Sequence, residues 1–170
     1  MEKSESPESL SHVDRAGRAR MVDVSTKPVT RRWATAEGEI RMKASTLAAV
    51  QSNEVKKGDV LTVARLASIG GAKRAADLIP LCHPLTLDAI EVEIGTKPEL
   101  PGIGLSVTVS TEGRTGVEME ALAGVMAGLL TVYDMCKALD RGMEIGPVRL
   151  VSKVGGRTGE WHRSPDIGTP

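Results

Sequence analysis

Hydrophobic and polar residues alternate along several segments of the chain, and this alternation predicts β-strands. Residues 36–43 alternate charged with apolar or small side chains, as a strand with one exposed face does. Residues 86–96 alternate glutamates with apolar residues, and residues 103–110 alternate Gly, Ser and Thr with apolar residues. The turn at 97–102 predicts that these two strands pair as a hairpin. A last strand is predicted at 145–154.

The segment after the first strand predicts two helices. Ser45 has the hydroxyl side chain that is typical of an N-cap, here for a short helix at 46–51. Asp59 can cap a second helix, which begins with the apolar segment 60–67. That helix should end before Pro80, because a proline pushes the residue before it out of helical geometry.

The stretch Gly113–Asp140 contains no proline and predicts one long apolar helix. Its small residues Gly124, Ala127, Gly128 and Thr131 fall at helical spacing. Glycine inside a helix costs about 1 kcal/mol relative to alanine. The two glycines therefore predict that another backbone packs very close to this helix, with a second subunit as one candidate.

The order strand, helices, strand, strand, helix, strand predicts an α+β fold. It matches the ferredoxin-like split arrangement, in which an antiparallel sheet carries helices on one face. A chain of 170 residues fits one domain. We place this domain at 21–156, between a flexible N-terminal arm (1–20) and a flexible C-terminal tail (157–170). The other sheet face offers Glu, Ser and Thr, which suit water or another subunit.

Composition narrows the function classes. The formal net charge is zero, aromatic residues make up 2%, and phenylalanine is absent. Such a chain lacks the net positive charge that attracts a nucleic acid and the aromatic side chains on which bases stack, which argues against a nucleic-acid-binding protein. We find no apolar run of the roughly 18 residues that a membrane span needs and no signal peptide. Cys82 and Cys136 belong to no CxxC motif, which predicts reduced thiols in a cytoplasmic protein.

The usual catalytic templates are absent from the sequence: there is no GxxxxGK[ST] or GxGxxG loop, no GxSxG turn and no zinc-binding spacing. Several lysine and arginine side chains together can bind a polyanion such as a triphosphate. Carboxylates can accept hydrogen bonds from the N–H edge of a purine-like ring, or can transfer protons. These residues are compatible with an enzyme that acts on a small phosphorylated heterocycle. The candidates are Arg32, Lys57, Lys73, Arg74, Lys137, Lys153, Glu118, Glu120, Asp134 and His83.

Two features leave alternatives open. Asp134 and Lys137 lie three residues apart on the long helix, which fits an ordinary surface ion pair or an acid–base couple. His83 lies between Pro80 and Pro84, and fits a buried structural histidine or a proton donor. The residues alone do not rank an enzyme above a nucleotide-sensing module without catalysis, or above an assembly protein in which Asp134–Lys137 is an interface salt bridge.

Six segments together resemble one known family, the MoaC family of cyclic pyranopterin monophosphate synthases in molybdenum cofactor (molybdopterin) biosynthesis. The resemblance runs from about Met21 to Gly156, and the combination of these motifs in this order is highly specific. They are MVDVS at 21–25, KKGD at 56–59, DLIPLCHPL at 77–85, GRTGVEMEAL at 113–122, TVYDMCKA at 131–138 and IGPVRLVSKVGG at 145–156.

The resemblance implies a lyase. It would convert 3′,8-cyclo-7,8-dihydroguanosine 5′-triphosphate, made from GTP by a radical partner enzyme, into cyclic pyranopterin monophosphate with release of pyrophosphate. No cofactor or metal site is implied, although Mg²⁺ bound to the triphosphate is compatible with the reaction. The family forms a cytoplasmic homohexamer, a trimer of dimers, with its sites at subunit interfaces.

The resemblance also implies roles for individual residues. Catalysis is assigned to Asp134, Lys137 and Lys57. Substrate binding is assigned to Leu81, Cys82, His83, Glu118, Met119 and Glu120. Three further substrate-binding residues are assigned as phosphate ligands: Arg32, Lys73 and Lys153. Which subunit supplies Lys57 and His83 is left open.

Overall fold

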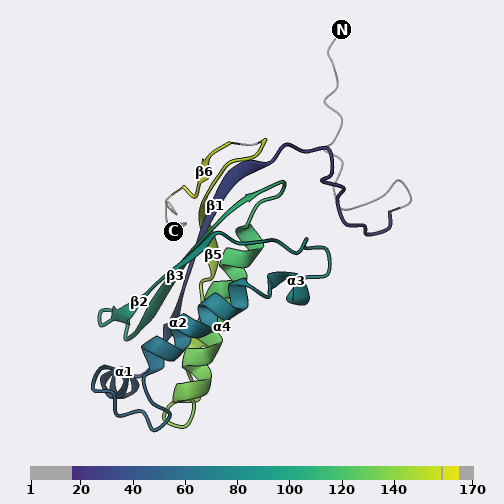
Figure 1. Ribbon diagram of the computed structural model, residues 1–170. Helices are drawn as coiled ribbons and strands as arrows, with labels where there is room; N and C mark the ends of the chain where they lie inside the picture. The colour runs from purple at the N-terminus through teal and green to yellow at the C-terminus, as the bar shows by residue number, and fades with distance from the viewer. Residues whose placement is uncertain (1–16, 158, 165–170) are drawn as a thin grey trace.

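The computed structural model describes residues 17–157 and 159–164, and its centre is an antiparallel sheet (Figure 1). Neighbouring strands follow the order β2-β3-β1-β5-β6, with β4 paired to one end of β1. The bounds are β1 Thr30–Arg41, β2 Ala89–Lys97, β3 Gly102–Gly113, β4 Glu144–Ile145, β5 Arg149–Val154 and β6 Trp161–His162.

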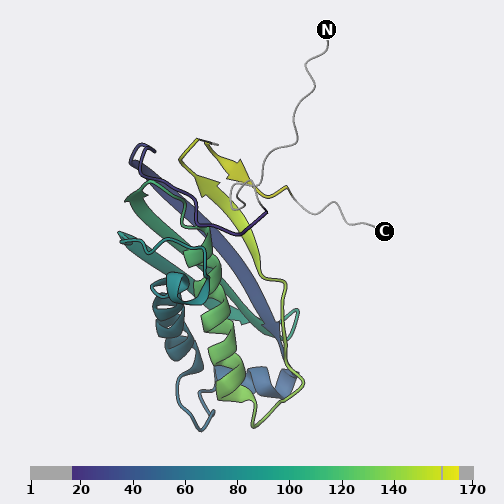
Figure 2. The ribbon, with the colours of Figure 1, turned by 90° about the vertical axis from the view of Figure 1, so that its right-hand side faces the viewer.

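Helices cover one face of this sheet. Figure 2 shows α4 running along the sheet, with α1 near its lower end. α2 and α4 pack on each other, and α4 lies against β1 and β3. The helices span α1 Ala44–Gln51, α2 Val60–Ala72, α3 Ala75–Leu78 and α4 Glu118–Cys136. The predicted α+β fold with an antiparallel sheet and helices on one face is confirmed.

Alternation along the strands decides which side chains form the core. In β1 the buried positions Ala34, Ala36 and Ile40 face the helices, and in β3 Val107 and Val109 do the same. The predicted hairpin is also confirmed, because β2 and β3 pair antiparallel from end to end. The core is almost wholly aliphatic, as the scarcity of aromatic residues requires.

Several boundaries differ from the sequence prediction because tertiary partners extend or shorten the elements. β1 begins at Thr30 rather than at 36, since β3 pairs with it along that whole length. α4 begins at Glu118 rather than near Gly113, because the residues up to Gly113 continue β3. The predicted last strand is divided into β4, on β1, and the longer β5.

The two predicted helix caps have opposite outcomes. Asp59 caps α2 as predicted, accepting hydrogen bonds from Thr62 N at 3.0 Å and Thr62 Oγ1 at 2.6 Å. Ser45 does not cap α1. The N-cap position is Lys43, whose N–H donates to Asp140 Oδ2 at 2.8 Å. α1 therefore has no side-chain cap, and the N–H of its N-cap residue is bonded by a carboxylate 97 residues away, which no local pattern could reveal.

Both predicted terminal arms lie partly outside the described residues. For the predicted N-terminal arm, residues 1–16 lie outside them, and so do residues 158 and 165–170 of the predicted tail. Within that tail, Trp161–His162 forms β6, which pairs with Ser152 and Lys153 of β5. The domain boundaries themselves remain a prediction.

The glycines of α4 are explained by α2 of the same chain. A Cβ at Gly128 would lie 3.3 Å from the carbonyl oxygen of Ala64 and 2.5 Å from Leu105 Cδ1. A Cβ at Gly71 on α2 would lie 2.8 Å from the Ala123 carbonyl oxygen of α4. The close backbone predicted from the sequence is thus present, but it belongs to α2 and not to a second subunit.

One helix within the described residues, α4, is long and apolar enough by length and composition to cross a membrane. A buried core helix passes the same test, and half of the apolar window of α4 is buried against the rest of the fold. The sequence prediction concerned an uninterrupted apolar run, and α4 has none of that length, because Glu118, Glu120 and Asp134 interrupt it near its two ends.

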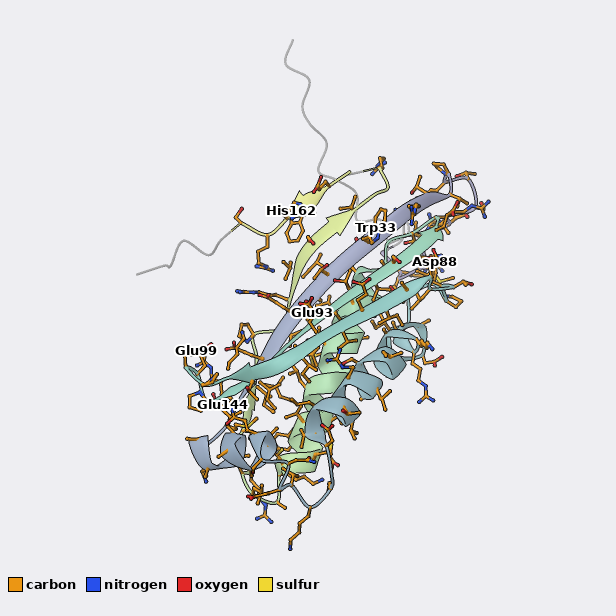
Figure 3. The ribbon with its side chains drawn as sticks, turned by 60° about the vertical axis from the view of Figure 1, so that its left-hand side comes forward. Trp33, Asp88, Glu93, Glu99, Glu144 and His162 are labelled. Atoms are coloured by element: carbon orange, nitrogen blue, oxygen red, sulfur yellow. The ribbon has the colours of Figure 1, made fainter. Side chains whose placement is uncertain are left out.

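The face of the sheet away from the helices is polar, as predicted. Figure 3 views this side, with the strands in front of α4 and with Trp33 and Glu93 labelled. Cross-strand pairs cover it: Glu37 accepts from Arg149 Nε at 2.9 Å, and Thr35 and Thr108 share a hydrogen bond of 2.9 Å. The glutamates on β1 are therefore largely neutralised within the chain.

A glycine-to-alanine pair tests the close packing of α2 on α4. Gly128→Ala should lower the free energy of unfolding by about 1–2 kcal/mol, because the strain of overpacking exceeds the gain of about 1 kcal/mol in helix propensity. Gly70→Ala is the matched control, since nothing lies within 4 Å of a Cβ there. It should be neutral or slightly stabilising in urea unfolding. Equal stabilities for the two variants would contradict the packing explanation.

Candidate functional site

Three side chains meet at the C-terminal end of α4. Asp134 lies in the last turn of the helix, and Lys137 follows as its C-cap residue. Lys57, from the loop between α1 and α2, donates to Asp134 Oδ2 at 2.7 Å and to the Asp134 carbonyl oxygen at 2.9 Å. Lys137 Nζ donates to Asp134 Oδ1 at 2.6 Å. One carboxylate therefore holds two ammonium groups, and the predicted catalytic residues are brought together.

The two lysines decide the ionisation of Asp134. Hydrogen bonds from Lys137 and then Lys57, with their positive charges, lower the pKa of the Asp134 carboxyl to about 2. The carboxylate is ionised at neutral pH and is a weak base there. The side chains of Lys57, Asp134 and Lys137 remain 48%, 56% and 52% exposed, so the cluster is open to an incoming molecule.

A second cluster lies at the N-terminal end of α4. Glu118 Oε1 accepts a hydrogen bond from Lys153 Nζ of β5 at 2.9 Å. The carboxylate of Glu118 folds over Gly116, and a Cβ at Gly116 would overlap it. Gly116 thus leaves the space in which Glu118 meets Lys153.

Arg32 joins this cluster from β1. Its Nε donates to the carbonyl oxygen of Gly113 at 2.9 Å, and a Cβ at Gly156 would overlap its guanidinium group. Gly156 has φ +73, a backbone conformation that favours glycine. The guanidinium is therefore positioned by the end of β3 and by Gly156, which follows β5, and not by a carboxylate.

The buried Glu120 and the half-buried Cys82 form a pair beside these groups. Glu120 is only 3% exposed, and Cys82 Sγ donates to its Oε1 at 3.6 Å. Oε2 is buried without a hydrogen-bond partner among the described residues. Burial raises the pKa of Glu120, and burial with the neighbouring Glu120 raises the pKa of Cys82 to about 11. Cys82 is consequently a neutral thiol at pH 7, facing α4.

The remaining predicted substrate-binding residues lie near the same end. Leu81 and His83 follow α3 and are half-buried, so His83 is not the fully buried histidine that was one alternative. Met119 is 38% exposed on the first turn of α4. Lys73 is the exposed C-cap residue of α2, whose last turn packs beside the first half of α4.

α4 separates the predicted site residues into two groups. Glu118 and Asp134 are sixteen residues apart on one helix, about 24 Å at 1.5 Å per residue. The three predicted catalytic residues lie at the C-terminal end, and the nine predicted substrate-binding residues lie at the N-terminal end. One chain does not bring the two groups together.

A cleft of about 940 Å³ opens beside Arg32 and Lys153. Three further cations that the sequence prediction missed, Lys27, Arg114 and Arg157, also line it. No periodicity in the sequence distinguishes these three residues. Arg114 lies inside the motif at 113–122, while Lys27 and Arg157 lie just after the motifs at 21–25 and 145–156. Among the described residues, no group of three His, Cys, Asp or Glu side chains is arranged to hold a metal ion.

Comparison of the chain with known proteins identifies its family. The family model described as "MoaC family" matches residues 21–156, most of the chain. The chain belongs to the MoaC family. A protein named cyclic pyranopterin monophosphate synthase from Cereibacter sphaeroides strain KD131 is 56% identical over 155 residues, covering 91% of this chain and 98% of that protein. Proteins of the same name from two further strains of this species are 56% and 55% identical over the same coverage.

A carboxyl titration tests the cluster at the end of α4. The lowered pKa means that the ionised form of Asp134 is favoured in the folded chain, and that its contacts are lost only as the pH falls through about 2. The ¹³C resonance of the Asp134 carboxyl carbon should therefore stay constant from about pH 7 to pH 4. In a Lys57→Ala/Lys137→Ala double variant, the same resonance should begin to move towards the protonated value by pH 4. A wild-type midpoint close to 4 would contradict the structure.

Proposed function

We propose that the chain is a cyclic pyranopterin monophosphate synthase of molybdenum cofactor biosynthesis, a lyase, as its curated relatives are named. It acts on 3′,8-cyclo-7,8-dihydroguanosine 5′-triphosphate and releases pyrophosphate. The observation that carries this proposal is the contact of Lys57 and Lys137 with one carboxylate, Asp134, at the positions to which the family resemblance assigns catalysis.

The geometry supports a division of roles within this cluster. Asp134 is ionised and holds two ammonium groups, so it positions them and balances their charge rather than accepting a proton at neutral pH. The lysines are the groups with protons to give to ring nitrogens and oxygens as the five-membered ring opens and the pyranopterin forms. Removing either lysine would leave Asp134 with one partner and the remaining ammonium group in a different place.

The last chemical step needs a clamp for phosphates. A substrate hydroxyl oxygen attacks the α-phosphorus, its proton is removed, and the bond from that phosphorus to the pyrophosphate oxygen breaks. Negative charge builds up on the departing pyrophosphate, which Arg32 and Lys153 at the cleft can stabilise. No group of this chain needs to be oxidised or reduced, so the proposal includes no redox cofactor, and Mg²⁺ bound to the triphosphate would be compatible with it.

We further propose that each site is assembled from two chains, within a homohexamer of three dimers. The separation of about 24 Å along α4 is too long for one nucleotide to contact both groups within a chain. The outer surface of the helices exposes apolar side chains, Met126 and Leu130 of α4 and Val63 and Leu66 of α2, as subunit contacts do. Free Cys82 and Cys136 are consistent with a cytoplasmic location beside the radical enzyme that supplies the substrate.

A turnover assay tests the activity. Purified chain incubated with the cyclised nucleotide should release pyrophosphate, and Asp134→Asn or Lys137→Ala should lower kcat by at least about 100-fold because the ammonium groups lose their position or number. Lys97→Ala, a lysine on the open sheet face, should keep wild-type turnover. Binding of the nucleotide without release of pyrophosphate would favour a sensor. Loss of the oligomer in Asp134→Asn would favour an assembly protein.

Co-expression of two inactive variants tests the shared site. Asp134→Asn removes the group at one end of α4, and Lys153→Ala removes a cation at the other. If each site combines opposite ends of two chains, equal mixing should restore about a quarter of the wild-type sites. Mixed oligomers no more active than either variant alone would show that the site does not combine these two ends from different chains.

A further inference from the structure

Asp140 is a buried carboxylate to which the proposed mechanism gives no role. It lies in the turn that follows α4, three residues beyond the C-cap residue Lys137, and is only 3% exposed. Its Oδ2 accepts a hydrogen bond from the N–H of Lys43 at 2.8 Å, and its Oδ1 accepts one from the N–H of Gly142 at 3.0 Å. The bond from the Lys43 N–H lowers the pKa of Asp140, which is therefore ionised at neutral pH. Because a buried charge is costly unless strong hydrogen bonds replace its water, both backbone segments are firmly tied to this carboxylate.

The turn that carries Asp140 is itself fixed to the end of α4. The N–H groups of Leu139 and Asp140 both donate to the carbonyl oxygen of Cys136, at 2.8 Å and 3.1 Å. The hydroxyl of Tyr133, a residue of α4, donates to the carbonyl oxygen of Arg141 at 3.1 Å. These three bonds hold the Asp140 carboxylate in one position relative to the last turn of α4.

The N–H that Asp140 Oδ2 accepts belongs to Lys43, the N-cap residue of α1. α1 leads directly into the loop that carries Lys57. The helix and the loop are joined by local bonds, because the N–H groups of Ser52 and Glu54 each donate to a carbonyl oxygen of α1 at 2.9 Å. A shift of α1 at its start would therefore be passed on to Lys57, whose Nζ lies 2.7 Å from the Oδ2 of the predicted catalytic aspartate.

We propose that Asp140 is a positioning residue for the reaction: by tying the start of α1 to the turn after α4, it sets the place of Lys57 beside Asp134. Asp140 touches no reacting atom and acts through Lys57. It lies between two of the motifs that carry the family resemblance and in neither of them. The assignment of catalysis to Lys57 rests on the proposed function, whereas the placing of Lys57 against Asp134 does not.

The titration of Asp134 tests this role on the full chain without a turnover assay. In Asp140→Ala, Lys57 should lose its contact, and a carboxylate with fewer cationic partners is protonated at a higher pH. The ¹³C resonance of the Asp134 carboxyl carbon should therefore begin to move at a higher pH than in the wild type, as it should in Lys57→Ala. The loss of one negative charge by itself would act in the opposite direction. In the Lys57→Ala background, Asp140→Ala should move the Asp134 midpoint no further, because the contact that it supports is already absent.

Lys43→Ala is the matched control for the backbone bond. It removes the ammonium group that lies 3.8 Å from Asp140 Oδ1 but keeps the N–H that Oδ2 accepts, so its Asp134 midpoint should equal that of the wild type. Asp140→Asn has one side-chain acceptor oxygen in place of two, and should move the midpoint in the same direction as Asp140→Ala, but by less. The proposal is overturned by a wild-type midpoint in whichever Asp140 variants fold, by shifts that add to those of Lys57→Ala, or by an equal shift in Lys43→Ala.

Turnover measured in parallel distinguishes this inference from the proposed function. Asp140→Ala should lower kcat by about ten- to a hundredfold, the effect of misplacing a reacting group by about 1 Å, and should leave KM within about twofold of the wild-type value. Val109→Ala shortens a buried side chain at the end of β3 that lies beside the start of β1, and should keep the wild-type Asp134 midpoint even if it lowers stability. If the wild type does not convert the cyclised nucleotide but Asp140→Ala still moves the Asp134 midpoint, the positioning role stands and the proposed function fails. If the wild type converts the nucleotide and Asp140→Ala matches it in kcat and in the Asp134 midpoint, the proposed function stands and the positioning role fails.

Discussion

The close packing of α2 against α4 is the constraint on which the rest of the molecule depends. The two helices approach so closely that Gly71 and Gly128 have no room for a Cβ, and a Cβ at Gly124 would lie only 3.1 Å from the carbonyl oxygen of Ser68. On its other side α4 packs against β1 and β3. Both clusters of predicted site residues lie at its ends, so their positions depend on that packing.

The charges at the two ends of α4 agree with the helix dipole. Glu118 and Glu120 lie in the first turn, near the positive N-terminus, and Lys57 and Lys137 lie at the C-terminus. Lys57 also donates to the free carbonyl oxygen of Asp134, a group that the helix leaves without a partner. The charges at both ends of α4 are therefore of the sign that stabilises the helix.

Burial distinguishes the environments of Asp134 and Glu120. Asp134 is exposed and paired with two lysines, which lower its pKa, whereas burial raises the pKa of Glu120 although Cys82 donates a hydrogen bond to it. The motifs that contain them look alike in sequence, each an acidic residue within an apolar run. Their opposite environments come from the neighbours that the fold brings to them.

The sequence by itself determined the class of fold, the hairpin, the Asp59 cap and the Asp134–Lys137 pair, because each depends on residues close together in the chain. Its motifs also identified the family. Only the tertiary structure decided that Asp140 accepts the N–H of the α1 N-cap residue, that Lys57 reaches Asp134, that α2 is the partner of the α4 glycines, and that three further cations line the cleft. Those contacts join residues far apart in sequence, where alternation and helical spacing carry no information about which groups will meet.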